Sequence, residues 1–240
     1  MTGQIVVLII FLLTLFSVKL QSQDSYSDAN QLIQEVIKKL HENDTNKAAT
    51  FSYKALHIAR RVTDKGEVEH IEEHIIFRNN RPTVISRSIN HKADKISGSS
   101  PQGFNVSLRN ILASKYEYTF LSTEPIPIDG KKCFIVEFRP KQGLKLETKE
   151  DQILNRTRGK IFIDKDTLLV WRFEAWLPEG FSIYTYFKAY SANIAITFQE
   201  IDGIITEQLI TINGYYKNGW FASAKTLTET YTFTDFTRLP

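Results

Sequence analysis

Alternating apolar and polar residues between positions 159 and 176 predict a β-hairpin, to which the rest of the chain can be related. Two apolar runs, Lys160–Ile163 and Leu168–Trp176, flank the turn-forming sequence Asp164–Thr167. Similar runs separated by turn-forming residues recur along most of the chain. We therefore expect the other strands to extend or cover the sheet that this hairpin begins.

The second run of the hairpin predicts one buried face and one wet face. Its odd positions are apolar, whereas Arg172 and Glu174 place charge on the even positions. Successive side chains of a strand point to opposite faces, so the odd positions share a side. These odd-numbered residues are Leu169, Trp171, Phe173 and Ala175. A sheet with one wet face is typical of antiparallel rather than doubly covered parallel strands.

The recurring pattern predicts about eleven strands and a mainly β fold. Besides the hairpin, the expected strands are Phe51–Val62, Val68–Arg78, Arg81–Asn90, Tyr116–Thr123, Lys131–Arg139, Phe181–Tyr190, Ile194–Glu200, Ile204–Ile212 and Phe221–Phe233. Turn formers such as Thr63–Gly66 and Asn213–Gly214 separate them. Turn signals at this spacing are typical of an antiparallel sandwich or barrel.

Two helices are expected beside the strands. Ser27–His41 carries apolar residues at the helical spacing, with Ser27 as the N-cap, and Asn43–Asn46 is expected to end it. Its apolar positions are Leu32, Ile33, Val36, Ile37 and Leu40. A second, short helix is expected at Ser107–Lys115. A helix with a single apolar face must pack on another element.

The beginning of the chain has the pattern of an export signal. Ile5–Phe16 is almost continuously apolar, and polar residues follow at Gln21–Asp24. This apolar run is shorter than the roughly 20 residues that a membrane-spanning helix needs. We therefore predict a signal peptide at residues 1–23 and one exported domain at residues 24–240, with an uncleaved N-terminal anchor as the alternative.

We expect the mature N-terminus to lie between Gln21 and Ser25, because polarity rises abruptly there. N-terminal sequencing of the exported protein tests this directly. A chain that still begins with Met1 would favour the anchor.

Charge and cysteine content exclude several classes of protein. The chain of 240 residues has 30 basic and 27 acidic residues, interspersed, for a net charge of +3. This balance does not indicate nucleic-acid binding. Cys133 is the only cysteine, so no internal disulfide can form, and its apolar surroundings predict a small buried hydrophobe.

One sequence motif suggests metal chemistry. His70, Glu73 and His74 form an H-x-x-E-H motif, which on a helix can bind zinc as a hydrolase does. On a strand, His70, Glu72 and His74 would instead share a wet face. The flanking sequence favours the strand, and no G-x-S-x-G, phosphate loop or C-x-x-C occurs. We therefore predict no catalytic residue, no metal and no cofactor, with a zinc hydrolase as the least favoured alternative.

The order of elements and several local sequences resemble the periplasmic outer-membrane lipoprotein-sorting proteins, the family of the lipoprotein carrier and its receptor. The local resemblance lies in Tyr116–Tyr118, Ile128–Phe138, Gly159–Asp164 and Trp171–Ala175. It implies an incomplete antiparallel β-barrel, of about eleven strands here, whose open mouth is covered by helices. It also implies an apolar cavity that holds acyl chains.

Nine apolar residues are predicted to point into such a cavity: Ile33, Val36, Ile37, Phe134, Val136, Phe138, Leu169, Trp171 and Phe173. They line an acyl-chain site if the barrel is hollow, and form an ordinary core if it is filled. The first possibility predicts an exported, non-enzymatic carrier or sensor of lipid or lipoprotein in the periplasm of the cell envelope. The alternative is a protein-interaction or envelope-scaffold module, with an envelope protein as its partner.

Overall fold

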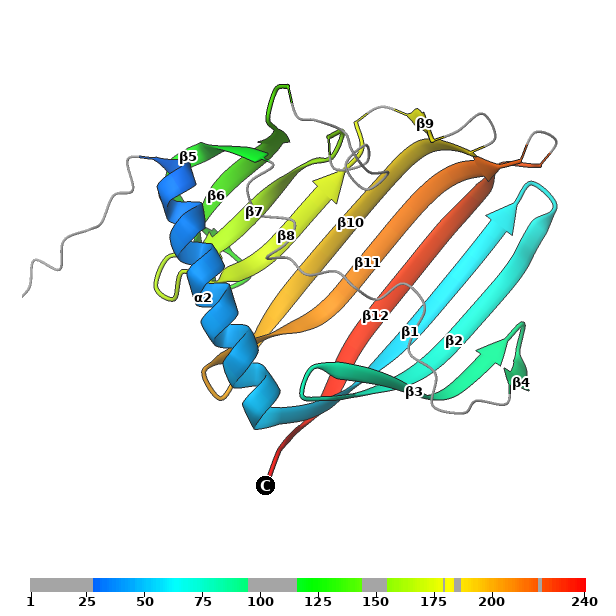
Figure 1. Cartoon of the computed structure of the whole chain (residues 1–240), viewed down its shortest axis with the longest axis horizontal. Coiled ribbons are helices and arrows are strands. Elements are labelled where there is room, and N and C mark those ends of the chain that lie inside the picture. The colour runs from blue at the N-terminus through cyan, green and yellow to red at the C-terminus, as the bar shows by residue number, and fades with distance from the viewer. Residues whose placement is uncertain (1–27, 95–115, 144–154, 179, 184–186, 220–221) are drawn as a thin grey trace, which may run out of the picture.

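The computed structural model describes residues 28–94, 116–143, 155–178, 180–183, 187–219 and 222–240, which form one sheet and one helix (Figure 1). The helix is α2, Ala29–Thr50. The strands are β1 Phe51–Thr63, β2 Gly66–Arg78, β3 Arg81–Ile89, β4 Lys92–Asp94, β5 Tyr116–Ile128, β6 Lys131–Pro140, β7 Arg158–Asp164, β8 Val170–Trp176, β9 Phe181–Ile183, β10 Phe187–Ile201, β11 Ile204–Asn218 and β12 Lys225–Arg238.

The sheet is antiparallel throughout and does not close. Its strand order is β4-β3-β2-β1-β12-β11-β10-β8-β7-β6-β5, with β9 pairing on β10. The first and last strands of this order, β4 and β5, do not pair with each other, and α2 lies across one face of the curved sheet (Figure 1). The predicted fold class, a mainly β, incomplete antiparallel barrel, is confirmed, and of the two predicted helices one, α2, lies within the described residues.

The helix α2 begins one residue later and ends much later than predicted. Asp28, not Ser27, is the N-cap, and its side chain accepts a hydrogen bond from the Asn30 backbone N–H at 2.9 Å. The predicted stop at Asn43–Asn46 lies inside the helix. Four of its five predicted apolar positions are buried, with Leu32, Ile33 and Val36 at 0% exposure, and Ile37 is partly buried.

Tertiary contacts explain why α2 continues through the predicted stop. The Asn43 side chain accepts a hydrogen bond from the Ile205 backbone N–H at 3.0 Å and donates one to the Ile205 carbonyl at 2.7 Å. One turn later, Lys47 binds the Glu207 carboxylate at 2.8 Å. Burial lowers the pKa of Lys47, but the nearby Glu207 and Tyr53 outweigh it and raise that pKa above its usual value. These contacts hold the last turns of α2 against β11.

Several strand boundaries also differ from the prediction. β10 continues through the gap predicted after Tyr190, and β11 continues through Asn213–Gly214. Gly214 pairs with Ala192, so an Asn-Gly sequence that often makes a hairpin turn is here part of a ladder. Beyond the predicted strand Arg81–Asn90, the short strand β4 was not predicted. The predictions for residues 1–23 and for the short helix at Ser107–Lys115 lie outside the described residues.

Within the described residues, no helix is long and apolar enough to cross a membrane.

Candidate functional site

One continuous row of side chains crosses the inner face of the sheet, meaning the face on which α2 lies. Cross-strand pairing from β5 to β3 places these residues side by side: Phe120, Val136, Ile161, Phe173, Ile196, Ile210, Tyr231, His57, Glu73 and Arg87. The six residues from β5 to β11 are apolar, and the last three, on β1, β2 and β3, are polar or charged. We call this set the inner row.

The apolar part of the inner row and α2 belong to one hydrophobic cluster. Ile33 and Val36 of α2 share it with Phe173, and all three have 0% exposure. The Phe173 ring also stacks on Phe138, with ring centres 5.5 Å apart. At this end of the sheet, therefore, α2 already packs on the inner face.

The nine predicted cavity residues all come together in or against this cluster. Seven of them are buried: Ile33, Val36, Phe134, Val136, Phe138, Leu169 and Phe173. Ile37 and Trp171 are partly buried and pack against it. Contact of these nine residues with a ligand stays a prediction.

The predicted regular alternation in β8 is interrupted at Trp171, which is only partly buried. A register shift against β7 pairs Arg172 with Phe162 but Val170 with Ile163, so one residue of β8 is additional. Val170, rather than Trp171, is fully buried beside Phe173. Trp171 instead has the Lys131 ammonium 5.2 Å from its ring centre. A bulge depends on the neighbouring strand, so the alternation within β8 does not predict it.

The polar end of the inner row is a buried cluster that was not predicted. His57 Nδ1 lies 2.9 Å from Glu73 Oε2, and Arg87 Nε donates to Glu73 Oε1 at 2.5 Å. The His57 ring stacks on Tyr231, with centres 4.2 Å apart and planes 4° from parallel. His57 and Glu73 are 5% and 3% exposed. One signal in the sequence could have indicated this cluster. His57 occupies a position that the alternation in Phe51–Ala59 predicts to be buried.

This cluster keeps Glu73 ionised. The hydrogen bond from His57 lowers the pKa of Glu73; burial opposes this, and Arg87 lowers the pKa further, so that it stays below its ordinary value. Because a carboxylate only accepts, His57 Nδ1 carries the proton of that hydrogen bond. In a neutral ring, Nε2 is then an acceptor. Among the described residues it has no hydrogen-bond partner, and the Glu229 carboxylate is 4.0 Å away.

The H-x-x-E-H motif does not assemble, because it lies on strand β2 as predicted. Glu73 faces inward, whereas His70 and His74 lie on the opposite face. His74 is exposed and its Nε2 is 3.2 Å from Glu72. The prediction that His70 is also solvated is wrong, since His70 is only 6% exposed.

Cys133 is buried at 0% exposure, as its apolar surroundings predicted. Burial raises the pKa of its thiol to about 12, and the nearby Asp164 adds to this. The thiol is therefore protonated at neutral pH, which does not suit a nucleophile.

No family model and no curated protein matches this chain. Similar solved structures exist, however. A DUF1329 family protein from Desulfovibrio piger is 14% identical, with a TM-score of 0.39, and the match covers 88% of this chain and 94% of that one. A LolA superfamily protein from Nitrosomonas europaea is 11% identical, with a TM-score of 0.37 and coverages of 89% and 95%. An outer-membrane lipoprotein-sorting protein domain from Vibrio parahaemolyticus, described as putative, is 9% identical, with a TM-score of 0.38 and coverages of 86% and 93%.

Two of these structures have descriptions that agree with the resemblance predicted from the sequence: one is named for the LolA superfamily and the other for outer-membrane lipoprotein sorting. At these identities and scores, the matches assign neither a ligand nor an activity to this chain. Its function has to be argued from its own residues.

Proposed function

We propose that this protein is an exported, non-enzymatic carrier that holds acyl chains of a lipid or lipoprotein on the inner face of its sheet, with α2 as the lid. The observation that carries the proposal is the inner row. Its apolar part crosses six successive strands of an open sheet, from Phe120 to Ile210, and only one described helix packs on that face. Such a face suits a long, flexible apolar ligand.

Binding would be driven by the hydrophobic effect. Each methylene group moved from water to this face contributes about 0.8 kcal/mol. The inner-face residues Ile194 and Ile212, which pair with each other, are only partly buried, so apolar area is left there for a ligand to cover. Displacement of α2 would uncover the rest, and its buried side chains would be replaced by the acyl chain.

The polar end of the inner row suits the head of such a ligand. His57 Nε2 and the Glu229 carboxylate lie close together and both can accept hydrogen bonds. A hydroxyl or amino group at the head of a lipid would supply the donor. The periplasm of a bacterial cell envelope is the compartment that we propose, and an envelope protein would deliver or receive the ligand.

The second candidate is a protein-interaction or envelope-scaffold module with a permanently filled core. The packing of α2 favours it, because Ile33 and Val36 already occupy the face that the acyl chain would need. In that case α2 would never leave the sheet, and the exposed surfaces would carry the function.

Acyl-chain binding can be tested with a radiolabelled monoacylglycerol, whose hydroxyl groups can donate, and with a triacylated lipopeptide, each titrated into the purified mature protein. We expect saturable binding of at least one of them, and the two probes distinguish a lipid from a lipoprotein ligand. Ile212→Glu is expected to weaken binding by roughly 10-fold or more, because the introduced charge would face the apolar chain.

The matched control is Thr211→Glu, which places the same charge at the neighbouring position of β11, on the opposite face of the sheet. It should bind as the wild type does. Circular dichroism checks that both variants fold. A folded wild type that binds neither probe would overturn the carrier and favour the filled-core module. If both variants lost binding affinity equally, the proposal that the acyl chain binds on the inner face would be wrong.

A further inference from the structure

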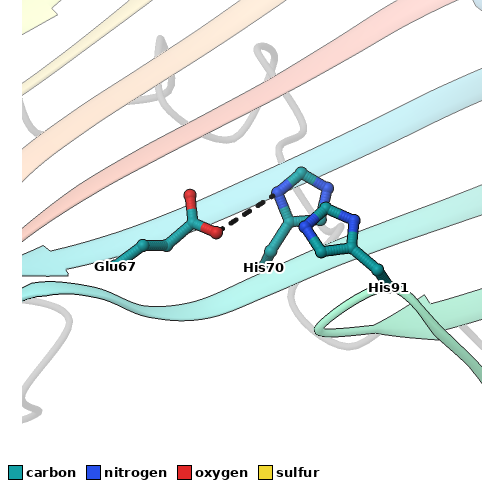
Figure 2. A group of neighbouring side chains, drawn as sticks. All are labelled: Glu67, His70 and His91. Atoms are coloured by element: carbon teal, nitrogen blue, oxygen red, sulfur yellow. Dashed lines mark ion pairs between the residues drawn. The ribbon is translucent and has the colours of Figure 1, made fainter.

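Three potential metal ligands meet on the outer face of the sheet, away from the inner row. They are Glu67 and His70 of β2 and His91 of the turn between β3 and β4 (Figure 2). One ligand atom from each lies within 4.8 Å of the other two. His70 Nδ1 is 4.0 Å from Glu67 Oε1, and the two imidazole rings stack with centres 4.5 Å apart.

A bulge in β2 places the first two ligands on one face. Without it, residues three apart in a strand would point to opposite sides. The register with β1 shifts between Arg61 and Val62, so that Glu69 pairs with Arg61 but Glu67 pairs with Val62. Val68 is the additional residue, and Glu67 is thereby turned to the side of His70.

The third ligand, His91, lies in a tight turn. The other residue of that turn, Asn90, forms hydrogen bonds with the backbone of His70. The His70 N–H donates to Asn90 Oδ1 at 2.9 Å, and the Asn90 N–H donates to the His70 carbonyl at 2.7 Å. These two bonds fix Asn90, and with it the adjacent His91, beside His70. The arrangement joins residues that are far apart in the sequence.

His91 occupies a left-handed backbone position at which glycine is the commonest residue. Asn90 and His91 form a two-residue hairpin turn, with φ of +50° and +64°. Such a turn favours Asn followed by Gly. The corresponding turns Asp129–Gly130 and Asp202–Gly203 do have glycine at the second position. The turn Asn79–Asn80 has asparagine there. Histidine therefore stands where the other two-residue turns of the described sheet with positive φ at both positions have glycine or asparagine, and this places its imidazole beside His70.

We propose that Glu67, His70 and His91 form a binding site for Zn²⁺. Two imidazoles and one carboxylate are a ligand set that zinc uses, and a three-ligand site leaves the fourth tetrahedral position to water. Zinc bonds of about 2.0–2.1 Å place ligand atoms roughly 3.4 Å apart, so the three side chains must close by about 1 Å. Glu67 and His91 are exposed and able to do so, while buried His70 provides the fixed point.

The bound metal would stabilise the edge of the sheet that β3 and β4 form. β4, at one end of the strand order, is three residues long and pairs with β3. A metal bridge from β2 to the β3–β4 turn would tie this short strand to the sheet interior. The site is independent of acyl-chain binding, since its residues lie on the opposite face from the inner row.

The test is isothermal calorimetry of ZnCl₂ with untagged, chelator-treated protein at pH 7.5. We expect one Zn²⁺ per chain, a rise in melting temperature on adding zinc, and weaker binding at pH 5.5, where protons compete for imidazole. His91→Asn is the decisive variant. Asparagine tolerates the left-handed conformation, so the fold should persist while zinc affinity falls by roughly 100-fold. Glu67→Gln should also weaken binding.

The chain provides a matched control in the His74–Glu72 pair, which lies on the same face of the same strand. His74→Ala with Glu72→Gln also removes one imidazole and one carboxylate, but it should leave zinc binding and the zinc-dependent melting shift unchanged. The proposal is overturned if the folded wild type takes up no zinc, or if His91→Asn binds zinc as tightly as the wild type. A loss confined to the His74 and Glu72 variant would likewise overturn it.

Discussion

Replacing Gly159 with alanine is expected to destabilise the protein by about 3 kcal/mol or more. Gly159 lies in β7, paired with Phe138 of β6 and Ala175 of β8. A Cβ at this position would overlap the Phe138 ring and the backbone carbonyl of Glu174. The carbonyl belongs to the neighbouring strand and cannot move without disturbing the ladder, and the ring is fully buried in the hydrophobic cluster. Urea denaturation measures the loss.

Gly214 provides the control for this prediction. It also lies inside a strand, β11, but a Cβ there would meet only the Ser191 carbonyl, at 3.9 Å. Gly214→Ala is expected to be neutral or slightly stabilising, because alanine loses less conformational entropy on folding. If both alanine variants proved equally stable, the close packing of Phe138 over Gly159 would be wrong.

Replacing Glu73 with glutamine is expected to cost about 3 kcal/mol of stability at neutral pH. Glutamine has nearly the same shape but no charge. It would leave the Arg87 guanidinium without its counter-ion and His57 without its charged acceptor. Because the Glu73 and His57 side chains are buried, water cannot replace these interactions. Chemical denaturation of the wild type and of the variant measures the difference.

The pH dependence gives a second, independent readout of Glu73. Its pKa in the folded protein lies below the ordinary value of 4.5. The unfolded chain therefore takes up the proton first, and the stabilisation by Glu73 is fully present above about pH 4.5. It is lost as the pH falls from there through the lowered folded pKa. Glu73→Gln should lack this part of the acid destabilisation.

Glu72→Gln is the matched control, because Glu72 is the neighbouring residue on the opposite face of β2. It pairs with exposed His74, and its loss should change stability by no more than about 0.5 kcal/mol. An equal effect of the two substitutions at pH 7, or an unaltered acid profile in Glu73→Gln, would contradict the role assigned to the buried cluster.

The local patterns of the sequence determined most of the secondary structure and the side of the sheet that is apolar. Alternation in Phe51–Ala59 and in Phe134–Phe138 corresponds to buried inner positions in β1 and β6. The Asp-Gly turns and the helical spacing of Leu32, Ile33 and Val36 likewise correspond to the observed hairpin turns and to the buried side of α2. In each case the signal lies within a few residues, where the geometry of a strand, a turn or a helix is set locally.

Tertiary structure decided the features that depend on a neighbouring element. Three features follow from register with another strand: the bulge at Trp171, the bulge that places Glu67 beside His70, and the continuation of β11 through Gly214. The length of α2 depends on contacts between Asn43 and β11. A local pattern contains no information about such partners.

The two polar clusters, at His57 and at His70, show most clearly which features the sequence determined and which the tertiary structure decided. His57, Glu73 and Arg87 come from three strands, and their charges meet only because cross-strand pairing places them in one row. The sequence did determine that each strand offers a polar residue, and it suggested metal chemistry near His70. It could not determine that His91, and not His74, is the histidine beside His70. That was decided by strand pairing and turn geometry, because side chains distant along the chain are brought together only when the sheet forms.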